Sequence, residues 1–292
     1  MILNGSGCLD ALTAPETAHQ LDAFVTKTVT PLPREGNEPV RIAEVEGGML
    51  NSIGLANPGI DAFCADVLPR LQELGVPLWV SVGGFCTEDY AAVCARLDGT
   101  AVDVLELNVS CPNVKAPDAA VAEIVAAARE ATSKPLYAKL SPALPDLAQA
   151  ATAAADAGAS GLTLVNTLRG LALDERTLAP VLGTAAGGLS GPALRSVALA
   201  AVHSCFGATE LPIVGLGGVA TGRHALELIA VGASAVAVGT TLFRDPDAPR
   251  RIRAELAAEL AALGLSDAAQ ARGLAHAGGA RVLPELAKIP AK

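Results

Sequence analysis

The sequence predicts a (β/α)₈ barrel, and three observations point to this fold. Short apolar, β-branched runs alternate along the chain with alanine-rich segments of helical period. The strand-like runs are apolar almost throughout, which is typical of parallel strands buried on both faces. Eight such units within 292 residues favour a closed barrel over an open doubly wound sheet. We therefore expect residues 1–292 to form one TIM-barrel domain.

The elements follow in chain order. The expected strands are Ile2–Asn4, Ala23–Thr30, Leu78–Gly83, Val102–Ser110, Leu136–Ser141, Gly161–Thr167, Pro212–Gly218 and Ala235–Thr240. Helical segments are expected at Glu88–Leu97, Ala119–Thr132, Leu147–Ala157, Pro192–Ser204 and His224–Val231. Residues 31–60 are rich in Pro, Gly and Asn, and we expect them to be the longest irregular connection. Long connections of this kind usually build the active face of a barrel.

Charge and composition exclude several classes of protein. The net charge is -9 and no basic run occurs, so neither nucleic acid nor an anionic membrane is an expected partner. No apolar segment reaches spanning length, and we expect a cytoplasmic protein. The six cysteines form no C-x-x-C pair, and all but Cys205, which follows His203, lie away from the histidines. This argues against a metal site or an iron–sulfur cluster held by this chain alone.

Catalytic and binding residues of a barrel lie at the carboxyl ends of its strands. Those ends carry Lys27, Ser81, Asn108, Cys111, Lys139, Asn166, Thr167, Gly217, Gly218, Gly239 and Thr240. Lys27 and Lys139 are two of only six lysines, and both fall within apolar strands. Burying an ammonium group costs several kcal/mol unless an anion compensates it. An anionic ligand is therefore expected at this rim.

Glycines at the ends of the last two strands indicate part of that ligand. "PIVGLGGVATG" and "AVAVGTTLF" place small residues where barrels often present backbone N–H groups to a phosphate. "GGLSG", residues 187–191, is expected to add a third glycine-rich loop. A ligand that reaches from these glycines to both lysines suggests a mononucleotide-like cofactor.

"ELNVSCPNVK", residues 106–115, places Cys111 between Asn108 and Asn113 where a strand ends. A cysteine among hydrogen-bonding side chains at a strand exit suggests chemistry. By contrast, Cys64, Cys94 and Cys205 fall on helical patterns that suggest packing. We favour similarly inert roles for Cys8 and Cys86.

These motifs occur together in one known family. "TKTVTPLPREGN", "NSIGLANPG", "ELNVSCPNV", "YAKLSP", "VNTL", "GGLSGPA", "GLGGV" and "AVAVGT" resemble class 1 dihydroorotate dehydrogenase, from about Gly5 to Phe243. The motifs are closer to the NAD-linked (type B) catalytic subunit than to the fumarate-using subfamily. The resemblance implies an FMN-carrying barrel that oxidises dihydroorotate to orotate in pyrimidine (UMP) biosynthesis.

The resemblance also implies a role for each matching residue. Cys111 would be the catalytic base. Substrate contacts would come from Lys27, Asn51, Ile53, Gly54, Leu55, Asn108, Asn113, Asn166 and Thr167. FMN contacts would come from Ser6, Lys27, Thr28, Asn108, Lys139, Val165, Gly191, Gly217, Gly218, Gly239 and Thr240. Ser81 stands where the family usually has asparagine, so we expect one flavin contact to be shorter or bridged by water.

The chemistry of these residue types agrees with the implied roles. A thiolate can take a proton from dihydroorotate while flavin N5 accepts a hydride. Each asparagine offers both a donor and an acceptor to a ring of imide groups. One lysine would stabilise the reduced, anionic flavin, and the other would pair with the substrate carboxylate.

The chain contains no fingerprint for NAD. "GLGGVATG" is not G-x-G-x-x-G, and no ribose-binding acid is identifiable after it. The resemblance to the NAD-linked subfamily therefore implies a second subunit that carries FAD and a [2Fe-2S] cluster, with this barrel as a homodimeric catalytic core.

Three alternatives remain open. A barrel isomerase or synthase without flavin would explain the glycines, but not Cys111 with its asparagines and two rim lysines. A related FMN barrel reductase of pyrimidine bases also uses a loop cysteine, but this chain lacks the iron–sulfur cysteines of those enzymes. A non-catalytic subunit would not need every chemical position of the site to be filled.

Overall fold

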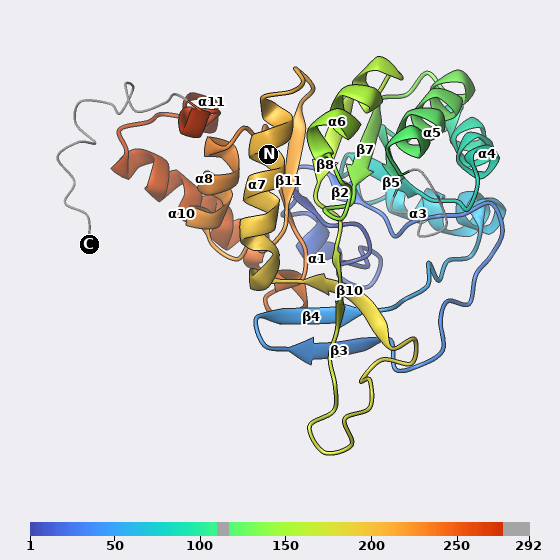
Figure 1. Ribbon diagram of the computed structural model, residues 1–292. Coiled ribbons are helices and arrows are strands. Elements are labelled where there is room, and N and C mark those ends of the chain that lie inside the picture. The colour runs from blue at the N-terminus through green and yellow to red at the C-terminus, as the bar shows by residue number, and fades with distance from the viewer. Residues whose placement is uncertain (110–116, 277–292) are drawn as a thin grey trace.

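The computed structural model describes residues 1–109 and 117–276, and these form a (β/α)₈ barrel (Figure 1). The parallel strands are β1 (Ile2–Asn4), β2 (Phe24–Val25), β5 (Leu78–Val82), β6 (Val104–Asn108), β7 (Leu136–Leu140), β8 (Gly161–Leu164), β11 (Ile213–Leu216) and β12 (Ala235–Val238). Their order is β1-β12-β11-β8-β7-β6-β5-β2, and a bridge between Leu3 and Ala23 brings β2 back to β1. The predicted fold class is confirmed, and each of these strands lies within its predicted range.

Helices surround the barrel. They are α1 (Pro15–Ala18), α2 (Ile60–Ala62), α3 (Leu68–Gln72), α4 (Thr87–Asp98), α5 (Pro117–Ala131), α6 (Leu147–Asp156), α7 (Arg195–Phe206), α8 (Gly222–Ala230), α9 (Thr241–Arg244), α10 (Ala248–Ala262) and α11 (Ala268–Ala271). Shorter turns are the π-helical η1 (Phe63–Val67) and the 3₁₀ segments η2 (Pro192–Leu194) and η3 (Leu274–His276). Side-chain caps fix the starts of α6 and α8: Asp146 accepts from the N–H of Gln149, and Thr221 from that of His224.

The barrel interior changes from apolar to polar along the strands. The rings of Trp79 and Tyr137 contact each other at a tilt of 53°, with centroids 4.6 Å apart, and Val104 packs in the same interior cluster. Because alternate residues of a strand share a face, Glu106 and Asn108 follow Val104 on the inner face of β6. The polar inner positions therefore lie toward the carboxyl ends of the strands.

A small antiparallel sheet lies beside the barrel, and it corrects two predictions. Residues 31–60 contain the hairpin of β3 (Ile42–Val45) and β4 (Gly48–Asn51), so this connection is not irregular throughout. The sheet continues through β10 (Ala186–Ser190) to β9 (Leu168–Leu171), as Figure 1 shows in part. "GGLSG" is thus mostly strand rather than loop. Its glycines permit close packing, since a Cβ on Gly188 would lie 2.2 Å from Thr167 Oγ1.

Asn4 supports the seam between β1 and β2. Its buried side chain accepts from the N–H of Val25 at 2.7 Å and donates to the carbonyl of Val25 at 2.7 Å. The amide thus takes the place of strand pairing at this point.

We expect Asn4→Ala to lower the free energy of unfolding by about 2–5 kcal/mol, because two buried backbone groups lose their partners. Denaturant titration measures this loss. Gln20→Ala is the matched control, since the side chain of Gln20 makes solvent-exposed hydrogen bonds with Asp247 and Arg250. Equal losses in the two variants would show that the seam does not depend on Asn4.

Candidate active site

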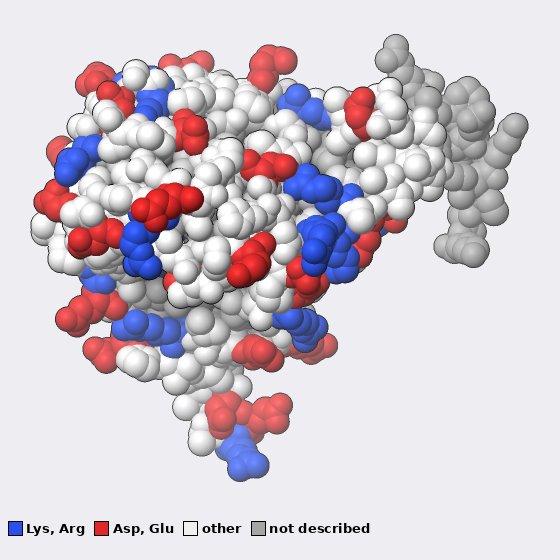
Figure 2. All heavy atoms as spheres, turned by 180° about the vertical axis from the view of Figure 1, so that it is seen from behind, with Lys and Arg blue, Asp and Glu red and all other residues white. Residues whose placement is uncertain are grey.

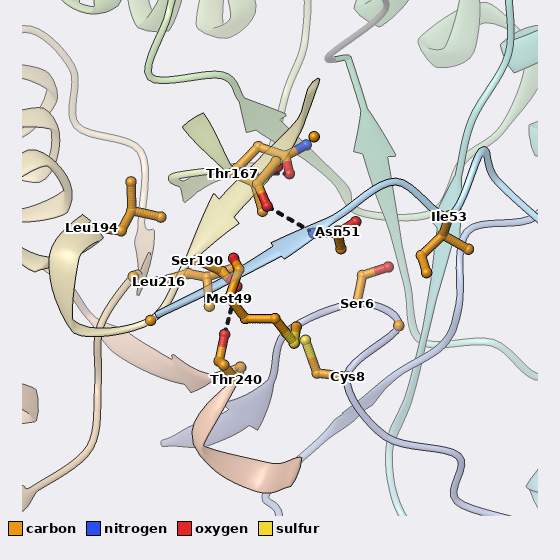
Figure 3. A pocket seen from close by; sticks show the side chains of 18 of the residues that line it. Ser6, Cys8, Met49, Asn51, Ile53, Thr167, Ser190, Leu194, Leu216 and Thr240 are labelled. Carbon is orange, nitrogen blue, oxygen red and sulfur yellow. Dashed lines mark hydrogen bonds between the residues drawn. The ribbon is translucent and has the colours of Figure 1, made fainter. Parts of the chain in front are cut away.

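A cavity of about 530 Å³ lies between the carboxyl ends of the barrel strands and the antiparallel sheet (Figure 3). This volume is within the usual range of about 300–1,000 Å³ for a small-molecule site. Apart from Ser81, every predicted site residue that the structure describes lines it: Ser6, Lys27, Thr28, Asn51, Ile53, Gly54, Leu55, Asn108, Lys139, Val165, Asn166, Thr167, Gly191, Gly217, Gly218, Gly239 and Thr240. Cys111 and Asn113 lie outside the described residues. The individual roles of all these residues remain predictions.

Hydrogen bonds fix the amides on the cavity floor. Asn166 Nδ2 donates to Asn108 Oδ1 at 2.8 Å, and Asn108 Nδ2 donates to Thr28 Oγ1 at 3.3 Å. The hydroxyl of Tyr90 donates to the backbone carbonyl of Asn108 at 2.8 Å. Because these contacts hold the Asn108 side chain and backbone, the floor offers a ligand a preformed polar surface.

Ser81 supports this network from behind. It is fully buried, its Oγ lies 3.0 Å from Thr28 Oγ1, and it is not among the residues that line the cavity. The short side chain thus contacts Thr28 within the barrel wall, and the expected shorter or water-bridged flavin contact stays a prediction.

Both strand-end lysines reach the cavity. Lys139 is 5 % exposed, and burial together with the charge of neighbouring Lys139 lowers the pKa of Lys27. Gly7 has φ 75°, and a Cβ there would lie 2.9 Å from Lys27 Cδ, so glycine is needed where the turn packs on this lysine. Two ammonium groups at one floor favour an anionic ligand.

The glycine end of the cavity is shaped by β11 and β12. Gly217 has φ 140° and would place a Cβ 2.7 Å from Ala198 Cβ, so a side chain does not fit there. On the neighbouring strand, Thr240 Oγ1 donates to Ser190 Oγ at 2.7 Å (Figure 3). Bare backbone at two adjacent strand ends suits a phosphate group.

Several lining residues were missed by the sequence analysis. They include Cys8, Ile42, Met49, Leu194, Leu216 and Phe243. Cys8 enters the cavity because a turn, with its N–H bonded to the carbonyl of Gly5 at 3.0 Å, folds the chain back after β1. The sequence analysis favoured a packing role for Cys8, whereas the structure places this residue in the cavity wall. Burial raises the pKa of its thiol. Cys86 is exposed and does not line the cavity, whereas Cys94 and Cys205 are buried in helices.

Charges of both signs lie on the outer surface. On the face shown in Figure 2, basic and acidic side chains are interspersed rather than gathered by sign. Within residues 1–109 and 117–276, no helix is both long and apolar enough to cross a membrane. The cytoplasmic location remains a prediction.

The fold and this cavity are those of a (β/α)₈-barrel enzyme with a small-molecule site at the carboxyl ends of its strands. Residues 1–260 match the sequence model described as dihydroorotate dehydrogenase, and the chain belongs to this family of flavin-dependent oxidoreductases.

Known relatives are similar over most of the chain. It is 46% identical over 264 residues to the dihydroorotate dehydrogenase B (NAD(+)) catalytic subunit of Desulforudis audaxviator, covering 88% of this chain and 86% of the relative. The subunit of the same name from Listeria monocytogenes serovar 1/2a is 43% identical, with 85% and 84% covered. The crystal structure of DHODH with ferulenol from Eimeria tenella superposes with a TM-score of 0.79 at 25% identity, covering 94% and 85% of the two chains.

Proposed function

We propose that the chain oxidises dihydroorotate to orotate, with FMN as its resident cofactor, in pyrimidine biosynthesis. The observation that carries this proposal is a single cavity that combines two lysines, a set of fixed amides and a glycine-lined end. Relatives that cover most of the chain bear the corresponding name.

The cavity fits FMN by its chemistry. The bare backbone at Gly217, Gly218 and Gly239 and the hydroxyl of Thr240 would hold the phosphate. Lys139, Lys27 and Thr28 would hold the ring system, with Ser6, Asn108, Val165 and Gly191 as further contacts. When bound, FMN supplies the acceptor for the hydride of dihydroorotate.

The remaining residues suit a small anionic imide ring. Asn51, Asn108 and Asn166 each present a donor and an acceptor, and Thr167 adds a hydroxyl. The segment Ile53–Leu55 contributes its backbone, and Lys27 would pair with the substrate carboxylate. Cys111 would accept the proton lost from the substrate ring.

A visible spectrum of the purified protein tests the proposal. We expect flavin absorbance that bleaches when dihydroorotate is added without oxygen. A protein that neither contains nor takes up FMN would contradict it and favour the barrel isomerase or synthase. Bound flavin that dihydroorotate does not bleach would favour a related reductase.

We further propose that Lys139 stabilises the negative charge that the flavin gains on reduction. Lys139→Met keeps most of the buried volume but removes the charge, so the reduction potential of bound flavin should fall. Redox titration measures this potential. Lys134→Met is the control, because Lys134 Nζ bonds the carbonyls of Thr100 and Val102, and Lys134 is not among the cavity residues. An unchanged potential in Lys139→Met would leave Lys139 a packing or phosphate-binding role.

A further inference from the structure

Glu106 is a buried carboxylate below the cavity. It is 2 % exposed and lies on β6, two residues before Asn108, which lines the cavity. Because the two residues share the inner face of the strand, Glu106 points into the barrel one level beneath the floor. A carboxylate at this depth is costly unless a cation or several donors compensate its charge.

Lys139 provides that compensation. Glu106 Oε1 lies 3.5 Å from Lys139 Nζ, and the two side chains are only 3% and 7% exposed. The same oxygen accepts no hydrogen bond from the described residues. Its charge is therefore balanced chiefly by the ammonium group, and in a medium of low polarity it acts on groups several ångströms away.

The field of Glu106 reaches the cavity wall. The thiol of Cys8 lines the cavity, and its pKa is raised mainly by burial, lowered by Lys139 and Lys27, and raised by Glu106. These groups place two positive charges and one negative charge around the floor. Among the described residues, the charge of Glu106 thus offsets one of the two lysine charges, so that one positive charge at the cavity floor has no counter-charge.

We propose that Glu106 is a positioning residue that sets the redox chemistry of the cofactor through Lys139. By pairing with this lysine, it limits how strongly the floor stabilises the negative charge that a bound flavin gains on reduction. The inference rests on the proposed function, because it takes the bound cofactor to be FMN.

The test is the reduction potential of the flavin in the purified holoprotein. Glu106→Gln keeps the shape of the side chain and removes its charge. We expect at least a tenfold rise in the ratio of reduced to oxidised flavin at a fixed potential, which corresponds to about 30 mV for a two-electron couple. Flavin content and thermal unfolding are measured on the same samples.

Two further variants separate this role from packing. Glu106→Asp keeps the charge and alters the packing, so its potential should stay near that of the wild type. In a Lys139→Met background, Glu106 has no ammonium group through which to act, so Glu106→Gln should then cause little further shift. A purely structural role would change thermal stability in all of these variants without this pattern of potentials.

The outcomes are distinct. An unchanged or lower potential in Glu106→Gln overturns the proposal, and so does an equal shift with and without Lys139. If the Gln variant does not fold, a shifted potential in Glu106→Asp overturns it and an unshifted one supports it. If the wild-type protein binds no flavin, the proposed function is overturned as well. If dihydroorotate bleaches the flavin but Glu106→Gln leaves its reduction potential unchanged, only this inference is overturned.

Discussion

Cys111→Ala is expected to slow the reduction of bound flavin by dihydroorotate by about 10²- to 10⁴-fold, as is typical when a general base is removed. The reason is that a carbon-bound proton must leave the substrate, and alanine has no group that can accept it. FMN should stay bound, because the phosphate and ring contacts proposed above come from other strands. Stopped-flow spectroscopy under anaerobic conditions measures the rate.

Two controls sharpen this prediction. Cys111→Ser should retain a little activity that rises with pH, because a hydroxyl is a much weaker acid than a thiol and forms its basic state only at higher pH. Cys86→Ala should reduce flavin at the wild-type rate, since Cys86 is exposed and does not line the cavity. Near-normal reduction in Cys111→Ala would remove Cys111 from the mechanism.

The barrel could be predicted because its signal is local and repeated. Each strand is a short apolar run, and each long helix shows its own period, so the pattern survives errors at single boundaries. β6 lies within the predicted range 102–110, and α4 differs from the predicted helix by one residue at each end. The rim residues followed from this pattern, because parallel strands bring their carboxyl ends together.

The antiparallel sheet as a whole was missed because the pairing that joins its two halves is not local. β4 pairs with β10 through partners such as Leu50 and Leu189, which are far apart in sequence. Composition also misled, since Gly187 and Gly188 suggest a loop but serve close packing within a strand. Glu106 escaped attention for a related reason: its position within an apolar strand was visible, but its pairing with Lys139 depends on the neighbouring strand.

Once the flavin is reduced, its electrons must pass to an acceptor outside the barrel. Three of the four glycines of "GLGGVATG" have uses other than binding a dinucleotide. Gly217 and Gly218 line the cavity assigned to FMN, and Gly222 starts α8, where a Cβ would lie 2.2 Å from the backbone N of Leu256 in α10. Within the described part of the chain, no group of three or more His, Cys, Asp or Glu side chains could hold a metal ion. Relatives of this chain are named dihydroorotate dehydrogenase B (NAD(+)), catalytic subunit. We propose that a second subunit with FAD and a [2Fe-2S] cluster carries electrons to NAD, and that the barrel forms a dimer.

The isolated chain is accordingly expected to oxidise dihydroorotate with a dye or oxygen as acceptor and to form no NADH above background. The physical reason is that hydride transfer needs the nicotinamide and the flavin in contact, and we assign the nicotinamide site to the second subunit proposed above. Both acceptors are tested on one preparation, so that dye reduction proves the barrel active while NADH is followed by absorbance. Robust NADH formation without any added protein would refute the partner and would place a nicotinamide site on the barrel itself.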